Sequence, residues 1–298
     1  GRHVRDARHA RGFRRRQGQE LSRGELSAEF IAGGRGRLLA VVRRPSRAAC
    51  SGVLIVPPFA EEMNKSRRMA ALQARRLARL GYGVLQIDLL GCGDSSGDFR
   101  DARWESWKAH ARIALDWLRE RHSGRMTLWG TRIGALLAAD VAREPAVEVN
   151  ELLLWQPVAA GDTFLTQFLR LQLAAEMLSE GSASSGMRAL REQLKGGTSL
   201  EIAGYELHPE LAAALERAKL VQPAPHVQRV CWLEVSAQDD PKVTPASRRV
   251  LDAWRASGIE VQERAVQGEP FWSTLEIAQC EALLDATDAM VELQPARA

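Results

Sequence analysis

From Glu25 onward, short apolar runs alternate with segments whose apolar residues recur at helical spacing. A continuous apolar run such as residues 52–56, ended by Pro57 and Pro58, is typical of a strand buried on both faces of a parallel sheet. Strands that alternate with helices predict an α/β fold with a mostly parallel central sheet and helices on both faces. The predicted strands span residues 26–31, 38–42, 52–56, 82–88, 126–129, 151–156, 230–235 and 259–266.

The helices between these strands are predicted from their apolar faces and from the residues at their ends. Ser66 is a candidate N-cap for a helix whose apolar residues share one face, and Gly81 is its candidate C-terminal stop. Further helices are predicted over residues 104–118, from Gly134 onward, over 246–256 and over about 274–293.

The interval from residue 160 to residue 225 shows a helical pattern and is much longer than an ordinary loop of about 4–6 residues. We predict that it forms a helical cap over the sheet. The predicted organisation is a basic tail at 1–24, an α/β core at 25–159 and 226–298, and the cap at 160–225. Phe164 and Phe168 in the first cap helix either pack against the core or line a substrate lid, and both roles are compatible.

Charge is concentrated at the start of the chain. The formal net charge is +4, but residues 1–23 hold eight arginines against Asp6 and Glu20, and the remainder carries 33 basic and 35 acidic residues. The tail lacks the apolar segment of a signal peptide, and we interpret it as a solvated extension, not as a site for nucleic acid or anionic lipid. No apolar run approaches the ~18 residues that span a bilayer, so no stable membrane insertion is expected.

The cysteines are widely spaced and form no metal-binding pattern with the histidines. Their positions are Cys50, Cys92, Cys231 and Cys280. A reduced cytoplasm fits this spacing best, and neither a metal nor a cofactor is expected.

Residues 130–134 read Gly-Thr-Arg-Ile-Gly and lie between a predicted strand and a predicted helix. An α/β-hydrolase carries its Gly-x-Ser-x-Gly nucleophile elbow in such a place. Arg132 stands at the nucleophile position, and a protonated guanidinium has no lone pair with which to attack an acyl carbon. The pattern therefore predicts the elbow without its usual chemistry.

The other two triad positions are also altered. The loop after residues 230–235 offers Asp240 as the triad acid, although this carboxylate would equally cap the helix near Pro245. All six histidines precede Asp240, and Trp272 stands in the loop where the catalytic histidine is expected. Without that base the Ser–His–Asp mechanism has no proton acceptor.

A relocated nucleophile is one alternative. The glycine-rich turn after the fourth predicted strand contains Cys92, Ser95 and Ser96, and open α/β sheets bind their ligands at such strand ends. Glu61 or Glu269 would have to serve as the base. Structural demands alone also produce a turn of this composition.

Arg132 admits two interpretations. The start of a helix favours negative charge, so a guanidinium there, covered by a cap, would form a receptor for a carboxylate or a phosphate. Alternatively, Arg132 is held in an internal ion pair, because a covered cation needs a partner. The candidate partners are Glu61, Glu62, Asp88, Asp94 and Asp240.

Other residues around the elbow complete the predicted site. Glu61 and Glu62 would either perform acid–base chemistry at a shifted pKa or simply satisfy the start of a helix. Trp272 is the aromatic residue that we expect to wall the pocket. The predicted ligand-binding residues are Phe59, Glu61, Glu62, Lys65, Ser95, Arg132 and Trp272, and the degenerate triad positions are Arg132, Asp240 and Trp272.

Several longer motifs resemble one family. Residues 57–69 (PPFAEEMNKSRRM) and 86–98 (QIDLLGCGDSSGD) closely resemble the exosortase A system-associated hydrolase 2 family, as do 153–157, 202–206 and 270–272. The resemblance runs from about Glu25 to the C-terminus. It implies an α/β-hydrolase fold, a bacterial cytoplasmic setting and a place in exopolysaccharide production, and an arginine at the elbow is typical of that family.

Two function hypotheses follow from these residues. The first is a hydrolase that acts on an ester or acyl bond through a non-standard site. The second is a pseudoenzyme that binds an anionic small molecule or serves as a scaffold, using Arg132 at the former elbow. The expected partners are a small anionic ligand and proteins of exopolysaccharide assembly, and no nucleic acid.

Overall fold

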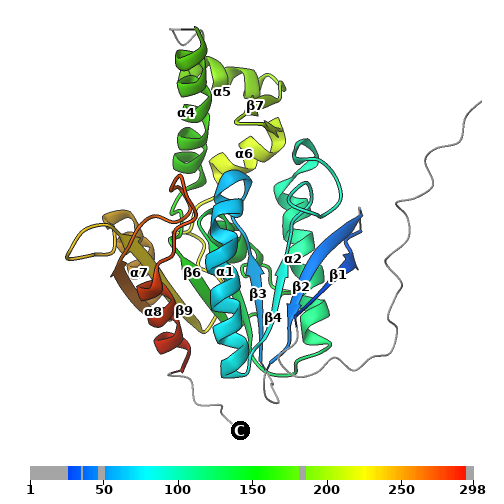
Figure 1. Cartoon of the computed structure of the whole chain (residues 1–298), viewed down its shortest axis with the longest axis vertical. Helices are drawn as coiled ribbons and strands as arrows, with labels where there is room; N and C mark the ends of the chain where they lie inside the picture. Colours follow the sequence, from blue (N-terminus) through cyan, green and yellow to red (C-terminus); the bar gives the residue numbers. More distant parts are fainter. Residues whose placement is uncertain (1–25, 35, 46–50, 181–185, 293–298) are drawn as a thin grey trace, which may run out of the picture.

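The apolar runs form one eight-stranded sheet in a computed structural model that describes residues 26–34, 36–45, 51–180 and 186–292 (Figure 1). Strand β2 is antiparallel to both of its neighbours, and the remaining neighbours pair in parallel. Across the sheet the strands lie in the order β1 (Leu26–Ala32), β2 (Arg37–Arg43), β4 (Gly83–Ile87), β3 (Gly52–Val56), β5 (Met126–Thr131), β6 (Glu151–Trp155), β9 (Arg229–Ser236) and β10 (Glu260–Gln267). The predicted α/β class and mostly parallel sheet are confirmed.

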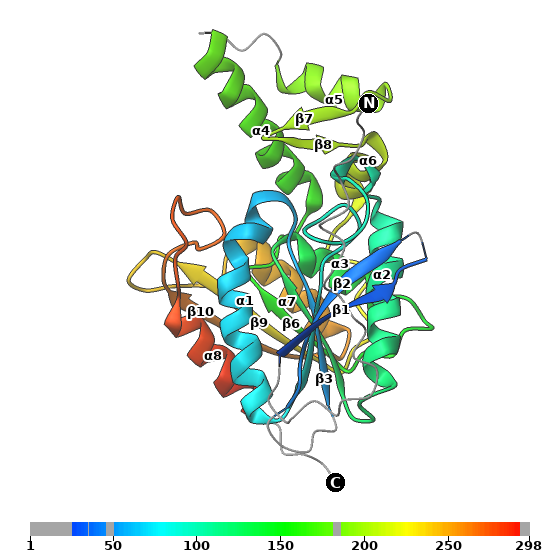
Figure 2. The ribbon, with the colours of Figure 1, turned by 45° about the vertical axis from the view of Figure 1, so that its right-hand side comes forward.

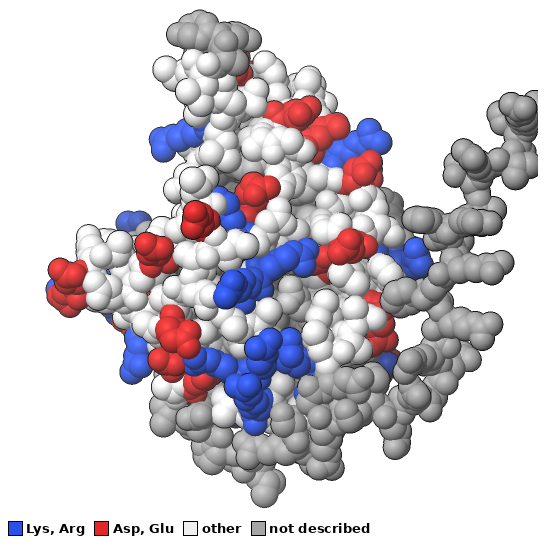
Figure 3. Space-filling view, in the orientation of Figure 1, with Lys and Arg blue, Asp and Glu red and all other residues white. Residues whose placement is uncertain are grey.

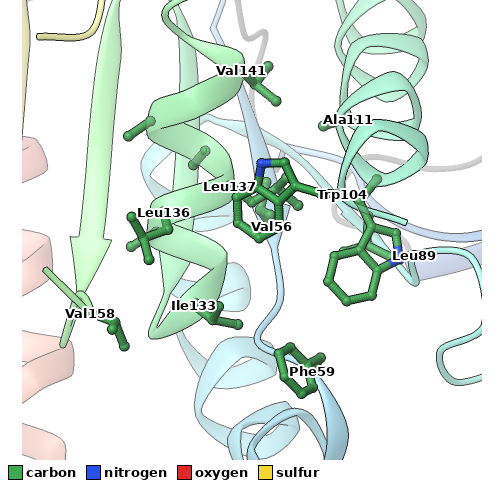
Figure 4. Close-up of a cluster of buried hydrophobic side chains, with 14 of the residues drawn as sticks. Val56, Phe59, Leu89, Trp104, Ala111, Ile133, Leu136, Leu137, Val141 and Val158 are labelled. Atoms are coloured by element: carbon green, nitrogen blue, oxygen red, sulfur yellow. The ribbon is translucent and has the colours of Figure 1, made fainter. Parts of the chain in front are cut away.

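Helices cover both faces of this sheet because the central strands are apolar on both faces. Helices α1 (Ala60–Leu80) and α8 (Glu281–Glu292) pack on the face that contains Val53 and Ile55. Helices α2 (Trp104–Arg119), α3 (Ile133–Val141) and α7 (Pro245–Ala256) pack on the other face. Figure 4 shows part of this second core, where Val56, Leu137 and Trp104 meet.

The sequence predicted the C-terminal end of one helix correctly and the starts of two helices incorrectly. Gly81 ends α1 with a left-handed φ of 104°, as expected. Ser66 does not begin this helix: α1 starts at Ala60, and Ser66 is buried inside it. Likewise, α8 begins at Glu281 and not near residue 274. Phe59, which precedes α1, makes no side-chain capping hydrogen bond, so local capping does not set the start of that helix.

The chain between β6 and β9 leaves the core and lies above the sheet, as Figure 2 shows. We call residues 160–225 the inserted segment. It contains helices α4 (Gly161–Glu180), α5 (Met187–Lys195) and α6 (Pro209–Arg217), and a hairpin of β7 (Leu200–Ile202) and β8 (Tyr205–Leu207) that the sequence did not suggest. At the base of α4, Phe164 and Phe168 are buried against the core.

Three other features bear on the sequence predictions. Cys92, Cys231 and Cys280 are free and buried. Among the described residues, none of the helices is both long and apolar enough to cross a membrane. The basic tail predicted at residues 1–24 and Cys50 lie outside the described residues.

Candidate functional site

The turn from β5 into α3 has the backbone of a nucleophile elbow. Arg132 occupies its tip with φ 56° and ψ −121°, a conformation that non-glycine residues seldom adopt. The flanking glycines allow the tight turn: a Cβ on Gly134 would lie 2.4 Å from the carbonyl oxygen of Val56, and a Cβ on Gly130 would lie 2.5 Å from the Cα of Ala135. The elbow is therefore intact although an arginine stands at its tip.

Glu62, in the first turn of α1, holds the Arg132 side chain. Nη2 of Arg132 donates to Oε1 of Glu62 at 3.0 Å, and Nε lies 3.2 Å and 3.3 Å from the two carboxylate oxygens. Burial raises the pKa of Glu62, and the charge and hydrogen bonds of Arg132 counteract this rise. The internal ion pair considered from the sequence is thus present, with Glu62 as its acid.

Trp272 closes the other side of Arg132. The guanidinium carbon of Arg132 lies 5.1 Å from the centre of the Trp272 ring, within the range of a cation–π contact. Trp272 is buried and packs edge-on against Phe271. An indole ring cannot accept the proton that a triad histidine takes, so this position supports the arginine and supplies no base.

Asp240, the candidate triad acid in the loop after β9, does not lie at the elbow. Asp240 is 81% exposed and pairs with Lys242 at 2.8 Å, so it contacts nothing at the elbow. It does not cap α7 either, because the hydroxyl of Thr244 takes that position and accepts from the N–H of Ser247. The sequence reasoning missed Glu234, which is buried near the end of β9.

Glu234 is fixed by two hydrogen bonds. Its carboxylate accepts from the indole N–H of Trp232 at 2.8 Å and from the backbone N–H of Thr244 at 3.0 Å. An acidic residue inside the apolar run of β9 was the sequence signal that would have identified it.

The side chains that the sequence offered as relocated nucleophiles are held in structural contacts or stay protonated. The hydroxyl of Ser95 donates to the carbonyl of Asp88 at 2.6 Å and accepts from the N–H of Leu39 at 2.8 Å. The hydroxyl of Ser96 accepts from the N–H of Arg37 at 2.9 Å. Burial raises the pKa of the Cys92 thiol to about 12, so it remains protonated. These side chains hold the turn together.

Three further predicted ligand residues lie apart from Arg132 or in the core. Phe59 is 1% exposed and packs in an aromatic cluster with Phe99, Phe164 and Phe168, so it has no free face for a ligand. Glu61 accepts a hydrogen bond from the hydroxyl of Tyr205 at 2.8 Å, which joins α1 to the inserted segment. Lys65 is half-buried on α1 and does not line the cavity beside Arg132.

That cavity, of about 680 Å³, lies at the carboxyl ends of β5, β6 and β9, where open α/β sheets bind their ligands. Arg132 contributes to its wall from the core, with Glu234 and the start of α7 beside it. Lys219 and Arg249 bring two more positive charges from the inserted segment and from α7. Neither forms an ion pair within the described part of the chain, and Glu234 is the acidic residue of the lining, so the positive side chains of the wall outnumber the negative.

No group of three or more histidine, cysteine, aspartate or glutamate side chains that could hold a metal ion lies among the described residues.

Solved structures of α/β hydrolases share this architecture. Est1E from Butyrivibrio proteoclasticus, solved with ferulic acid, aligns with a TM-score of 0.64 at 15% identity over 90% of this chain and 99% of its own. A carboxyl esterase from Bacillus coagulans, solved with glycerol, gives 0.60 at 11% identity over 90% and 98%. Alpha/beta hydrolase domain-containing protein 10 from mouse gives 0.53 at 18% identity over 90% and 99%.

These alignments establish the α/β-hydrolase fold. At such low identity they carry the fold alone. The sequence matches no protein-family model and no curated protein, so the resemblance to the exosortase A system-associated family stays a prediction.

Proposed function

We propose that this α/β-hydrolase-fold protein binds an anionic small molecule in the cavity beside Arg132 and performs no Ser–His–Asp catalysis. The observation that carries the proposal is the charge of the cavity wall, where Arg132, Lys219 and Arg249 outnumber the acidic Glu234 and arginine replaces the elbow serine. A guanidinium at the tip of an elbow also sits at the start of α3, where the helix dipole favours an anion.

The ion pair with Glu62 is compatible with ligand binding. The carboxylate of Glu62 engages Nε and Nη2 of Arg132, and within the described chain no hydrogen bond involves Nη1. Glu62 therefore orients the guanidinium and leaves one edge of it for a ligand oxygen. Lys219 and Arg249 supply charge that no protein carboxylate neutralises among the described residues.

The ligand class follows from the size and lining of the cavity. A volume of about 680 Å³ suits a small organic molecule and not a polymer chain. Val158, Val221 and Val250 give the wall an apolar part beside the charges. An acyl, sugar-acid or phosphorylated intermediate has the matching combination of charge and carbon skeleton.

The biological setting rests on the resemblance of the longer motifs. From it we propose a bacterial cytoplasmic setting and a role in exopolysaccharide production linked to the exosortase A system. Proteins of exopolysaccharide assembly are then its expected partners.

A second function, hydrolysis of an ester or acyl bond, is favoured by one observation: Glu62 is partly exposed beside the intact elbow, and burial raises its pKa. Its carboxylate would take a proton from water as the water oxygen attacks the acyl carbon. The same proton would then pass to the leaving oxygen, which yields the acid and the alcohol. Backbone N–H groups at the start of α3 would stabilise the oxyanion.

Thermal melting with glucuronate and glucose 1-phosphate tests the binding proposal. We expect both to raise the melting temperature, and Arg249→Gln and Lys219→Gln each to reduce that rise. Arg217→Gln, which removes an exposed arginine outside the cavity wall, is the matched control. Equal stabilisation of the cavity variants and the control variant would refute the proposal.

Turnover of p-nitrophenyl esters distinguishes the second function, hydrolysis, from binding without catalysis. Activity that a serine-directed fluorophosphonate leaves intact and that Glu62→Gln abolishes would support water activation by Glu62. Covalent labelling by the fluorophosphonate would overturn the absence of a serine nucleophile. No turnover at all would refute hydrolysis of these esters and leave the binding proposal standing.

A further inference from the structure

A second, smaller cavity of about 200 Å³ lies away from the elbow, in a groove between α1 and the outer strands of the sheet. Its apolar wall comes from Val41 and Val84 on the strands and from Ala71 on α1. Arg43 and Arg67 are its charged lining residues. We call this space the edge groove.

The two arginines of the edge groove differ in their partners. Arg67 donates to the carboxylate of Asp88 at 2.9 Å and is neutralised there. Arg43 forms no ion pair within the described ranges, and its Nε is shielded from solvent without a hydrogen-bond partner. The guanidinium of Arg43 lines the groove without a carboxylate partner among the described residues, so an anion in the groove would meet a charge that the protein does not neutralise.

The surroundings of Arg43 are positive. Burial, and to a smaller extent the nearby charge of Arg75, lower the pKa of Arg43. Figure 3 shows Lys and Arg side chains gathered over the face that α1 presents. Such a field attracts anions and disfavours cations.

We propose that the edge groove binds a small organic anion, with its carboxylate or phosphate on Arg43 and a short apolar body along Ala71 and Val84. Inorganic anions fit less well because most of the wall is apolar. Neutral molecules of the same shape would lack the charge that the guanidinium of Arg43 attracts. This site does not depend on Arg132 or on the cavity at the elbow.

Calorimetric titration of the full chain tests this proposal. The probes are hexanoate and hexyl phosphate, with hexanol, hexylammonium and inorganic phosphate as comparisons. We expect the two amphiphilic anions to bind and the comparisons to bind at least tenfold more weakly. The stronger of hexanoate and hexyl phosphate identifies the headgroup. Equal binding of hexanol would overturn the role of charge.

Matched variants locate the site. Arg43→Gln should weaken binding at least tenfold, and Ala71→Leu should block the apolar part of the groove. Arg79→Gln changes an exposed arginine on α1 that does not line the groove and should have no effect. Loss of binding in Arg249→Gln with retention in Arg43→Gln would place the anion in the elbow cavity and overturn this proposal. If Arg43→Gln does not fold, the Ala71→Leu result decides.

Discussion

Arg132 and Glu62 depend on each other because neither side chain is well solvated. Arg132 is 14% exposed and Glu62 is 20% exposed. Removing one partner of such a pair leaves a covered charge that the protein must either tolerate or neutralise by protonation. The pair also lies at the elbow, where an α/β hydrolase carries its nucleophile.

Arg132→Ala should therefore cost about 3 kcal/mol of folding free energy near neutral pH, the lower end of the range for a broken buried pair. Without the guanidinium, the pKa of Glu62 rises further above its ordinary value of 4.5. A raised folded-state pKa gives stability that is present at low pH and lost as pH rises. Urea unfolding should show a larger deficit at about pH 8 than at about pH 5.

The control for this experiment is Glu62→Gln in the Arg132→Ala background. It removes the titrating group, so the difference between the two pH values should shrink. A deficit in Arg132→Ala that is independent of pH would show that lost packing, and not the unpaired carboxylate, explains the cost.

At the scale of residues, the sequence indicated what chemistry a single side chain can perform better than it indicated which residues that side chain contacts. Arg132 and Trp272, two of the predicted triad positions, lie 5.1 Å apart from guanidinium carbon to ring centre, but Trp272 is not among the residues that line the cavity. The acid was misplaced: Asp240 faces solvent, whereas Glu234 lies at the cavity. Lys219 and Arg249 had no local signal, since only the packing of the inserted segment on α7 brings them to one cavity.

At the scale of elements, the contact between α3 and the strand β3 depends on the absence of a side chain. Gly134→Ala would push a Cβ to 2.4 Å from the carbonyl oxygen of Val56 and 2.6 Å from that of Pro57. Since both are backbone atoms, the helix has to move, and we expect a loss of about 2–3 kcal/mol in chemical denaturation.

Gly196→Ala is the comparison for this variant. Gly196 follows α5 with an ordinary φ of −75°, and the nearest atoms to a new Cβ lie 3.3 Å away. The change should alter stability by less than about 1 kcal/mol. Equal losses in the two variants would contradict the close approach of α3 to β3.

The sequence predicted strands more accurately than helix starts. A run such as Gly52–Val56 is apolar throughout, so burial on both faces identifies it without any knowledge of its neighbours. The start of α1 gave no such signal. Phe59 precedes it without a side-chain cap hydrogen bond, and its ring is instead held by the aromatic cluster under α4. The hairpin of β7 and β8 is too short for its pattern to stand out.

At the scale of the whole molecule, the inserted segment is joined to the core by a few polar contacts beside the apolar ones. Tyr205 donates to Glu61 at 2.8 Å, and Arg103 pairs with Glu210 at 3.2 Å. Burial and the hydrogen bond to Glu61 raise the pKa of Tyr205 from 10.0 to about 12. The hydroxyl therefore remains a donor over the whole physiological range.

Alkaline unfolding tests this junction. A folded-state pKa above the unfolded value gives stability that is present below pH 10.0 and lost as pH rises toward about 12. Tyr205→Phe should lose about 1 kcal/mol at neutral pH and show a shallower alkaline decline. Tyr82→Phe, which changes the other tyrosine, should retain the Tyr205 part of the decline. Identical curves of stability against alkaline pH for wild type and Tyr205→Phe would refute the contribution of the Tyr205 hydroxyl to this junction.

The two ends of the inserted segment meet. Ala160 bridges to Lys219, and the N–H groups of Gly161 and Leu220 donate to the carbonyls of Ala218 and Ala159 at 2.9 Å and 3.0 Å. Because the inserted segment begins and ends at adjacent points of the core, it can be exchanged for another insertion without moving the strands on either side. Replacing the inserted segment with a short turn would remove Phe164 and Phe168 from the aromatic cluster and leave every strand of the eight-stranded sheet in place. Exchange of the segment at this junction would change the part of the cavity wall that Thr163, Gln167 and Lys219 supply and would leave the sheet unchanged.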